Sequence, residues 1–294
     1  CKFVVVMQTP SDSSNISRCD SKALLSDARY LTIHGMMQRI SSLSFCGSRI
    51  GLFISAYLLC GAVASEELLI AVASNFSGPM AELAKRFEAQ TGHNIQVAYG
   101  SSGRLFAQIR SGAPFQVFLS ADQGKPARLV ELGLADSASR FTYASGELVL
   151  WSADSSREVR DSNALLSSDV HRIALANPRL APYGTAAAEA LDELGLSAQL
   201  SGKIVQGENI AQTFQFVESG NAQLGLVARS QVLSLTETRA GATWVVPGHL
   251  YRPIRQDAVL LNRAIGCQAC SEFLRFLRED AQRALISASG YRVD

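Results

Sequence analysis

The strongest constraint on the fold is a short apolar run that leads directly into a helix start, residues 68–83 (LLIAVASNFSGPMAEL). The first five of these residues are aliphatic, which is typical of a strand covered on both faces in a parallel sheet. Ser74, Asn75 and Ser77 then offer N-cap side chains, and Pro79 suits a first helical turn because it has no N–H to leave unpaired. A strand that ends here presents backbone N–H groups, a hydroxyl and an amide at the carboxyl edge of its sheet. The sequence therefore predicts an anion site at this edge.

The first 64 residues do not read as part of the same fold. Residues 36–64 contain two methionines and two arginines, then an apolar run, and then the small-residue sequence AVA, which is the order of a secretory signal peptide. The apolar run, residues 50–60, is about half of the ~20 residues that span a bilayer, so we expect export to the periplasm and cleavage near Ala64. A membrane anchor and a lipoprotein attached through Cys60 are weaker alternatives. Residues 1–35 begin with cysteine and show no periodicity, and we interpret them as a non-native upstream segment.

The part of the chain from Ser65 onward carries 21 Lys and Arg residues against 23 Asp and Glu residues. Such a balance provides no basic field for nucleic acid. Cys267 and Cys270 are spaced C-x-x-C, but no second pair of metal ligands accompanies them. We therefore expect a disulfide formed in an oxidising compartment rather than a metal site or a thioredoxin-type redox site.

Strand-like and helix-like segments alternate along this part of the chain, which predicts parallel α/β sheets. The expected extended segments are residues 68–72, 93–99, 115–120, 147–152, 173–176, 203–206, 224–228, 244–246, 251–254 and 258–261. The expected helices are residues 80–90, 104–110, 126–132, 185–194, 210–219, 270–277 and 280–287, and residues 157–169 are loosely helical.

Two α/β lobes fit this order better than one large sheet. We expect the chain to cross between them near residues 143–146 and 247–255. Lobe 1 then comprises residues 65–145 and 254–294, and lobe 2 comprises residues 146–253. A ligand would lie in the cleft between the lobes, where strand ends and helix starts face each other.

No set of residues with catalytic spacing is evident. His93, His171 and His249 are isolated in the sequence, and none has the spacing of a metal site. Residues 100–103 (GSSG) are one residue short of the G-x-S-x-G motif, and no dinucleotide or nucleoside triphosphate motif is present. The sequence therefore favours a protein that is not an enzyme and that needs no cofactor.

Uncharged hydrogen-bond donors recur at four expected helix starts, two in each lobe. One such start alone is an ordinary helix cap, but four of them favour an anion site in the cleft. About five to seven such bonds to a dianion, at ~1.5–3 kcal/mol each less the cost of dehydration, make micromolar or tighter affinity reachable. The four starts are Ser74-Asn75, Ser101-Ser102, Pro182-Tyr183-Gly184 and Asn209-Ile210.

Several short motifs resemble the periplasmic molybdate-binding proteins of molybdate ABC transporters, and together they cover nearly all of the chain after Ala64. They are residues 71–76 (AVASNF), 99–105 (YGSSGRL), 112–122 (GAPFQVFLSAD), 177–178 (NP), 181–184 (APYG) and 207–209 (GEN).

The resemblance implies a type 2 periplasmic binding protein that closes on molybdate or tungstate and delivers it to a membrane permease. It implies a monomer whose only ligand is the oxyanion. The ligand positions of the family correspond to Ser74 (hydroxyl and N–H), Asn75 (N–H), Ser102 (hydroxyl and N–H), Tyr183 (N–H) and Ile210 (N–H).

Three residues depart from the family pattern. Ala228 stands where some members have a tyrosine that binds the oxyanion, and Tyr183 stands where those members have a small residue. We therefore hypothesise that Tyr183 supplies its hydroxyl to the ligand from the other loop. Gln116 stands where an acidic residue is expected, and we expect it to affect packing rather than the ligand.

Other functions remain open from the sequence alone. A binding protein for sulfate or another tetrahedral oxyanion would differ only in pocket size, which the sequence does not measure. An effector-sensing domain of a regulator lacks support because no DNA-binding helix pair is appended. An enzymatic function lacks support because the sequence shows no group of residues spaced as a catalytic base with its partners or as a set of metal ligands.

Overall fold

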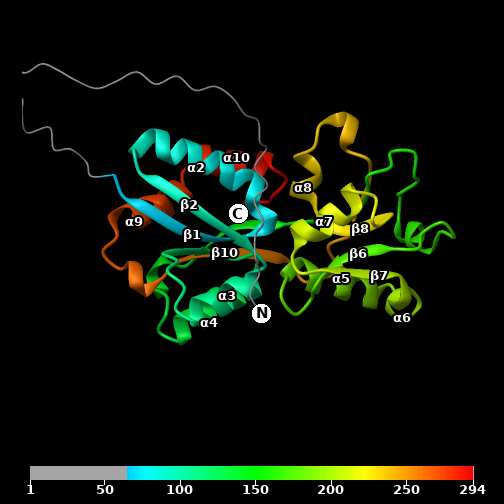
Figure 1. Cartoon of the computed structure of the whole chain (residues 1–294), viewed down its shortest axis with the longest axis horizontal. Helices are drawn as coiled ribbons and strands as arrows, with labels where there is room; N and C mark the ends of the chain where they lie inside the picture. Colours follow the sequence, from blue (N-terminus) through cyan, green and yellow to red (C-terminus); the bar gives the residue numbers. More distant parts are fainter. Residues whose placement is uncertain (1–64, 294) are drawn as a thin grey trace, which may run out of the picture. The chain divides into compact units, whose positions relative to one another are not determined.

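The computed structural model describes residues 65–293, so the expected signal peptide and the upstream segment lie outside the described residues. Two five-stranded mixed sheets form two lobes, each with helices on both faces (Figure 1). The prediction of two α/β lobes is therefore confirmed. The first sheet has the order β2-β1-β3-β10-β4, formed by β1 (Glu67–Ala73), β2 (Asn94–Gly100), β3 (Val117–Leu119), β4 (Phe141–Gly146) and β10 (Ile254–Leu260). The second sheet has the order β7-β6-β8-β5-β9, formed by β5 (Leu148–Ser152), β6 (Ile173–Ala176), β7 (Ile204–Gly207), β8 (Leu224–Ala228) and β9 (Ala242–Val245).

The central strands of both sheets run parallel, so their carboxyl ends meet at one edge of each sheet. In the first lobe, β1 is parallel to β2 and β3, and Ala73 at the end of β1 pairs with Gly100 at the end of β2. In the second lobe, β6 is parallel to β7 and β8. The helix starts that follow β1 and β2 therefore lie side by side, as do those that follow β6 and β7.

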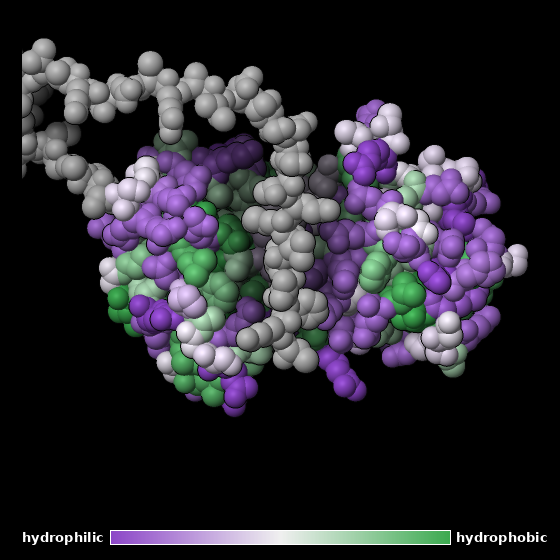
Figure 2. All heavy atoms as spheres, in the orientation of Figure 1, coloured by the Kyte–Doolittle hydropathy of each residue, from purple (hydrophilic) through white to green (hydrophobic). Residues whose placement is uncertain are grey.

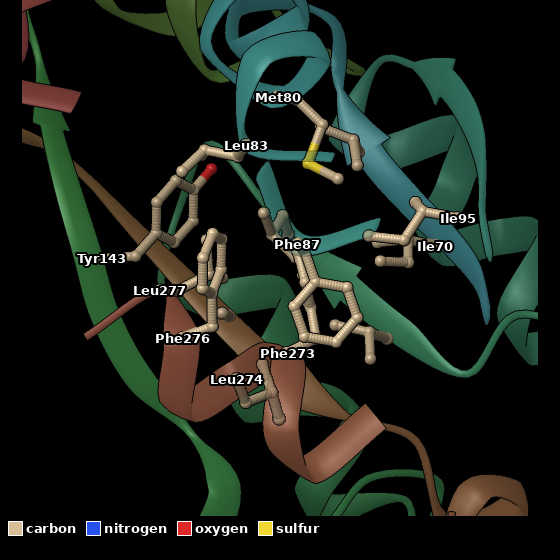
Figure 3. Packing of buried hydrophobic residues seen from close by; sticks show 14 of the residues in the cluster. Ile70, Met80, Leu83, Phe87, Ile95, Tyr143, Phe273, Leu274, Phe276 and Leu277 are labelled. Atoms are coloured by element: carbon tan, nitrogen blue, oxygen red, sulfur yellow. The ribbon is translucent and has the colours of Figure 1, made fainter. Parts of the chain in front are cut away.

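The helices of the first lobe cover both faces of its sheet. One face carries α2 (Ser77–Thr91), α9 (Gln268–Phe276) and α10 (Asp280–Ala288), and the other carries α3 (Ser102–Arg110) and α4 (Gly124–Glu131). In the core of the first face, the Phe87 ring lies 5.4 Å from the rings of both Phe273 and Phe276 (Figure 3). Helix α2 ends at Gly92, whose φ of 74° is left-handed. Glycine adopts this conformation without strain, as the Thr91-Gly92 sequence indicates.

The second lobe has the same layered arrangement. Helices α5 (Pro182–Glu193) and α6 (Ser197–Leu200) pack on one face, and α7 (Ile210–Glu218) and α8 (Arg229–Leu233) pack on the other. The stacked rings of Trp151 and Phe214, 4.5 Å apart, anchor α7 to β5. The chain passes from β4 to β5 at Glu147 and returns from β9 to β10.

The helical expectation for residues 157–169 is wrong. Only a 3-10 turn, η3 (Ser162–Leu166), forms there. Asp154 and Asp161 each accept a hydrogen bond from the backbone N–H two residues later, at 2.9 and 2.8 Å. Such local bonds offer the backbone an alternative to helix, which explains why the segment forms turns instead.

The two extended segments expected at residues 251–254 and 258–261 also need correction, because β10 is one continuous strand that starts at Ile254. Polar residues in its middle hide the pattern of a buried strand. Asp257 is buried there because the Thr142 hydroxyl donates to its carboxylate at 2.7 Å and Arg140 lies 2.9 Å from its other oxygen. Gln256 is fully buried beside it.

On the face drawn in Figure 2, the described part of the chain shows hydrophobic residues in separate patches among hydrophilic ones. Within residues 65–293, no helix is both long and apolar enough to cross a membrane.

Candidate functional site

The first lobe contributes two helix starts to the candidate site. At the end of β1 the chain enters η1 (Ser74–Phe76), a 3-10 turn that continues into α2. Ser74 and Asn75 are buried, although both are polar. The first N–H groups of a helix have no acceptor within the helix, so this turn directs backbone donors at the space beyond the sheet.

The second helix start of this lobe follows β2. The Ser101 side chain caps α3 by accepting from Arg104 N–H at 3.4 Å. The hydroxyl oxygen of Ser102 accepts from Ala121 N–H at 2.9 Å, and Ser102 is only 1% exposed. Because this oxygen is already an acceptor, its own proton is free to be donated to another group.

The second lobe contributes the starts of α5 and α7. Pro182 occupies the first position of α5, so Tyr183 N–H is one of its first free donors. Asn209 caps α7, and its side-chain oxygen accepts from the N–H groups of Ala211 and Gln212 at 2.9 and 3.0 Å. Ile210 is the first residue of this helix, and its N–H also precedes the intrahelical bonds.

All four helix starts meet at one small cavity. Its volume is about 10 Å³. All five residues predicted to bind the anion line this cavity, and none of the lining residues carries a charge. Four helix N-termini with neutral donors are an arrangement that favours an anion without a salt bridge. The lining residues are Ala73, Ser74, Asn75, Gly100, Ser101, Ser102, Ala121, Ala181, Pro182, Tyr183 and Ile210.

A larger cavity of about 440 Å³ adjoins the small one. Four of its five charged side chains form two pairs: Lys125 Nζ lies 2.5 Å from the Asp122 carboxylate, and Arg252 Nε donates to the Glu189 carboxylate at 2.7 Å. These cations already have anionic partners. The small cavity is therefore the better candidate for an anion, despite its size.

Direct contacts close the cleft between the lobes beside the small cavity. Gly103 N–H in α3 donates to the Leu180 carbonyl in the second lobe at 2.8 Å. The Ser74 hydroxyl donates to the side-chain oxygen of Asn209 at 3.3 Å. An exposed ion pair also joins Arg104 to Glu208 at 3.0 Å. The described structure is thus a closed form, in which Ser74 has a partner on the opposite lobe.

The hydroxyl of Tyr183 does not lie where the sequence hypothesis puts it. A Cβ added to Gly146 would lie 1.9 Å from this hydroxyl, so the Tyr183 side chain ends against the backbone of β4. Gly146 does not line the cavity. Gln256 Nε2 faces the same place but does not meet the hydroxyl in hydrogen-bond geometry. The geometry favours the N–H of Tyr183 as the donor and places its hydroxyl at the crossing between the lobes.

Three buried tyrosines lie at the cavity or behind it, and we call Tyr143, Tyr183 and Tyr291 the hinge tyrosines. Burial is the main cause that raises the pKa of each phenol above its usual value. Neighbouring tyrosines raise the pKa of Tyr143 and Tyr183 further. The hinge tyrosines are therefore neutral at physiological pH, and the cavity is lined by no acid or base that could transfer a proton.

Of the three histidines, His93 is buried among polar partners. His93 Nδ1 accepts from Glu66 N–H at 3.1 Å, and its Nε2 lies 3.5 Å from a Glu272 oxygen. His171 and His249 are exposed. Within residues 65–293, no group of three or more His, Cys, Asp or Glu side chains could hold a metal ion.

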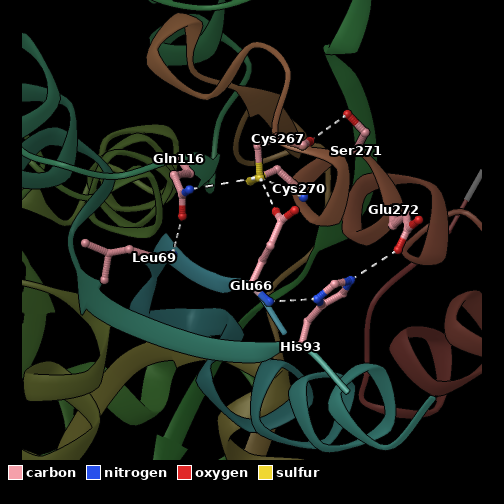
Figure 4. The surroundings of a disulfide bond; sticks show 8 residues. All are labelled: Glu66, Leu69, His93, Gln116, Cys267, Cys270, Ser271 and Glu272. Atoms are coloured by element: carbon pink, nitrogen blue, oxygen red, sulfur yellow. Dashed lines mark hydrogen bonds and ion pairs between the residues drawn. A yellow bond between two sulfur atoms is a disulfide. The ribbon is translucent and has the colours of Figure 1, made fainter. Parts of the chain in front are cut away.

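Cys267 and Cys270 form the predicted disulfide at the start of α9 (Figure 4). Gln116 lies beside it: its Nε2 is 4.0 Å from Cys267 Sγ, and its oxygen accepts from Leu69 N–H at 2.8 Å. Gln116 therefore acts in packing, at the part of β1 that lies away from the cavity.

Sequence reasoning missed two features of the site. Asn209 was identified only as part of a helix start, but its side chain also bonds Ser74 across the cleft. The Asn75 side chain donates to Gln256 at 2.9 Å and to Tyr291 at 3.0 Å. The Asn-type cap of α7 was visible in the sequence, whereas the partners of Asn75 are distant in sequence and left no local pattern.

Comparison with known proteins places this chain in a family. A family model described as bacterial extracellular solute-binding protein matches residues 68–292. Molybdate-binding protein ModA of Azotobacter vinelandii is 43% identical over 250 residues, which cover 85% of this chain and 99% of that protein. ModA of Rhodobacter capsulatus is 45% identical over 228 residues, which cover 78% of this chain and 89% of that protein.

Solved structures give the same picture. The periplasmic molybdate-binding protein of Azotobacter vinelandii superposes with a TM-score of 0.74 at 37% identity, covering 77% of this chain and 99% of that one. The sulfate-binding protein SubI of Mycobacterium tuberculosis superposes with a TM-score of 0.62 at 16% identity, covering 78% of this chain and 87% of that one. The second similarity concerns the fold alone.

Proposed function

The chain belongs to the family of bacterial extracellular solute-binding proteins, and we propose that it binds molybdate and tungstate and delivers them to the membrane permease of an ABC transporter. One observation carries this proposal: the starts of η1, α3, α5 and α7 converge on one small cavity whose lining is uncharged. The relatives at 43% and 45% identity are both molybdate-binding proteins.

The proposed ligand set consists of seven donors from five residues. Ser74 and Ser102 each contribute a hydroxyl and an N–H, and Asn75, Tyr183 and Ile210 each contribute an N–H. Hydrogen bonds to a charged ligand contribute ~1.5–3 kcal/mol each, and the helix N-termini add a favourable field. Seven such bonds sum to roughly 10–21 kcal/mol, which is above the about 8 kcal/mol that micromolar binding needs, and the difference is available to offset the cost of dehydrating the dianion.

The donor set also determines which protonation state of the ligand is bound. Backbone N–H groups can only donate, and so can the Ser102 hydroxyl, which already accepts from Ala121 N–H. The Ser74 hydroxyl would exchange its bond to Asn209 for one to the ligand. A fully deprotonated oxyanion therefore fits, and a ligand that must donate does not. We propose no catalytic residue, because the family is one of solute transport and the cavity contains no acid, base or metal ligand.

Sulfate is the alternative ligand, since it has the same charge and shape and differs in size. The identity of this chain to molybdate-binding proteins favours molybdate, whereas the sulfate-binding structure shares only 16% identity.

We further propose a monomeric periplasmic protein whose signal peptide is cleaved near Ala64. Lobe 1 would comprise residues 65–145 and 254–294, and lobe 2 residues 146–253. Capture would occur in an open cleft, and the permease would recognise the closed form.

Isothermal titration of the purified protein with molybdate, tungstate and sulfate in parallel tests the ligand. We expect dissociation constants of about micromolar or below for molybdate and tungstate, and no heat with sulfate. Sulfate binding of equal strength would refute the selectivity, and no binding of any of the three would refute the function. A variant with Ser74 and Ser102 both replaced by Ala is the control, because it should bind none of them while keeping the fold.

A further inference from the structure

Residues 290–293 connect the two lobes on the buried side of the site. After α10, Gly290 turns the chain with a φ of 89°. A Cβ added to Gly290 would lie 2.6 Å from Leu233 in α8, so the segment runs close against the second lobe. Arg292 then exchanges backbone hydrogen bonds of 2.8 and 2.9 Å with Ser145 in β4. This segment therefore lies against a crossing strand and a helix of the second lobe at the same time.

Tyr291 places its hydroxyl between the lobes. The hydroxyl donates to the Asn75 carbonyl of the first lobe at 2.7 Å. The same hydroxyl lies 2.9 Å from the Ser230 hydroxyl in α8 of the second lobe. Ser230 in turn donates to the Asn75 carbonyl at 3.2 Å. Three buried oxygens, two from the first lobe and one from the second, thus form a triangle with sides of 2.7, 2.9 and 3.2 Å, and the two hydroxyl protons supply two of its three hydrogen bonds at any one time.

The triangle fixes Asn75, one of the five proposed ligand residues. Its carbonyl accepts from Tyr291 and Ser230, and its side-chain amide donates to Gln256 at 2.9 Å and to Tyr291 at 3.0 Å. The Phe76 ring packs edge-on against Tyr291 at 5.4 Å. With its carbonyl and side chain both held, residue 75 has little freedom left, and its N–H stays at the cavity wall.

We propose that Tyr291 is a positioning residue that holds Asn75 toward the ligand and ties it to Ser230 when the lobes close. This inference rests on the proposed oxyanion function. The Ser230 contact joins α8 of the second lobe to η1 of the first. In this proposal it is made when the lobes close and lost when they separate. Tyr291 therefore slows the release of a bound oxyanion.

Tyr143 offers a matched control. It is also a buried tyrosine that packs edge-on against Phe76, at 4.9 Å. Its hydroxyl donates to Gln256 at 3.0 Å and to the Ser120 carbonyl at 3.3 Å, and both partners belong to the first sheet or its edge. Tyr143→Phe thus removes an equivalent buried hydroxyl from the same region without removing a contact to the second lobe.

The test compares Tyr291→Phe, Ser230→Ala and Tyr143→Phe with the unaltered protein. Stopped-flow release of molybdate gives koff, titration gives Kd, and thermal unfolding without ligand gives the structural cost. We expect Tyr291→Phe and Ser230→Ala each to raise koff roughly tenfold, as expected for the loss of a buried hydrogen bond. Tyr143→Phe should lower the melting temperature about as much as Tyr291→Phe does, because both remove a buried hydroxyl. It should raise koff less than about threefold. The double variant Tyr291→Phe with Ser230→Ala should raise koff by less than the product of the two single increases, because both substitutions break the same triangle of contacts.

Equal koff values for Tyr291→Phe and Tyr143→Phe would overturn the positioning role while leaving the oxyanion function intact. Multiplicative effects of the two substitutions at the triangle would overturn the link between the lobes. If the unaltered protein bound no oxyanion, the proposed function would fail first, and this inference would fail with it.

Discussion

Substitution of Gly103 by alanine should weaken ligand binding without lowering the stability of the ligand-free protein. Gly103 is the second residue of α3, and its N–H donates across the cleft to the Leu180 carbonyl at 2.8 Å. A Cβ at this position would lie 2.9 Å from both the Cα and the carbonyl oxygen of Leu180. Both of these are backbone atoms, so they cannot move aside as the end of a side chain could. The clash arises only when the lobes are closed.

The size of the effect follows from two opposing contributions. In the open form, alanine replaces glycine in a helix, which leaves stability unchanged or raises it by up to ~1 kcal/mol. In the closed form, the added methyl group forces the lobes apart by several tenths of an ångström, and overpacking of this kind costs about 1–3 kcal/mol. Since ~1.4 kcal/mol corresponds to a tenfold change, the dissociation constant for molybdate should rise about 5- to 150-fold.

Titration calorimetry and thermal unfolding without ligand measure the two contributions separately. Gly78→Ala is the matched control, because Gly78 is also the second residue of a first-lobe helix and a Cβ there meets nothing within 4 Å. We expect Gly103→Ala to melt no lower than the control and to bind molybdate more weakly. Equal affinity of the two variants would show that α3 does not meet Leu180 in the ligand-bound form, and the reasoning would be refuted.

Three further predictions concern the candidate site and the residues behind it. Ser102→Ala should raise the dissociation constant for molybdate about 10- to 150-fold and also lower the melting temperature without ligand, because it removes a donor and leaves Ala121 N–H unpaired; titration and calorimetry check both. Tyr183→Phe should change the affinity less than about threefold, because its hydroxyl lies against Gly146, and a loss above tenfold would instead place this hydroxyl on the ligand. Alkaline pH should destabilise the protein: the hinge tyrosines ionise near pH 10 in the unfolded chain but at higher pH in the folded one. The unfolded state therefore binds fewer protons above pH ~10, so stability is full below this pH and falls as pH rises through the folded values. Urea midpoints measured at pH 8 and pH 10.5 should differ accordingly, and equal midpoints would mean that the phenols ionise normally in the folded protein.

The helix starts of the site were predictable because each depends on a few consecutive residues. An aliphatic strand followed by Ser74 and Asn75, or a Pro182 at a first helical turn, is a local pattern with a local cause. Parallel strands bring such starts to the same sheet edge, so their convergence also followed from the α/β order. The structure places all five predicted residues around one cavity.

The contacts behind the cavity were not predictable, because they depend on residues that meet only in the folded chain. The bond from Asn75 to Tyr291 spans 216 positions, and that from Asn75 to Ser230 spans 155. The direction of the Tyr183 side chain could not be predicted from the sequence either, because it depends on the space that Gly146 leaves free in β4. Buried polar residues in β10 concealed a strand for the same reason: Gln256 and Asp257 have partners from other elements.

The arrangement explains why an anion should control closure. Each helix N-terminus carries a partial positive charge of roughly half an elementary charge, and closing the cleft brings two such termini from each lobe together. Without an anion these termini repel each other, and the contacts that cross the cleft oppose this repulsion. Two of these contacts are weak, because the Ser74 to Asn209 bond is 3.3 Å long and the Arg104 to Glu208 pair is more than 60% exposed on both sides. The Gly103 to Leu180 bond of 2.8 Å and the buried contacts of Ser230 are stronger. A dianion in the cavity would turn the repulsion into attraction and so add to the free energy of closure. Once the anion leaves, the repulsion returns and favours reopening, as the proposed delivery to a permease requires.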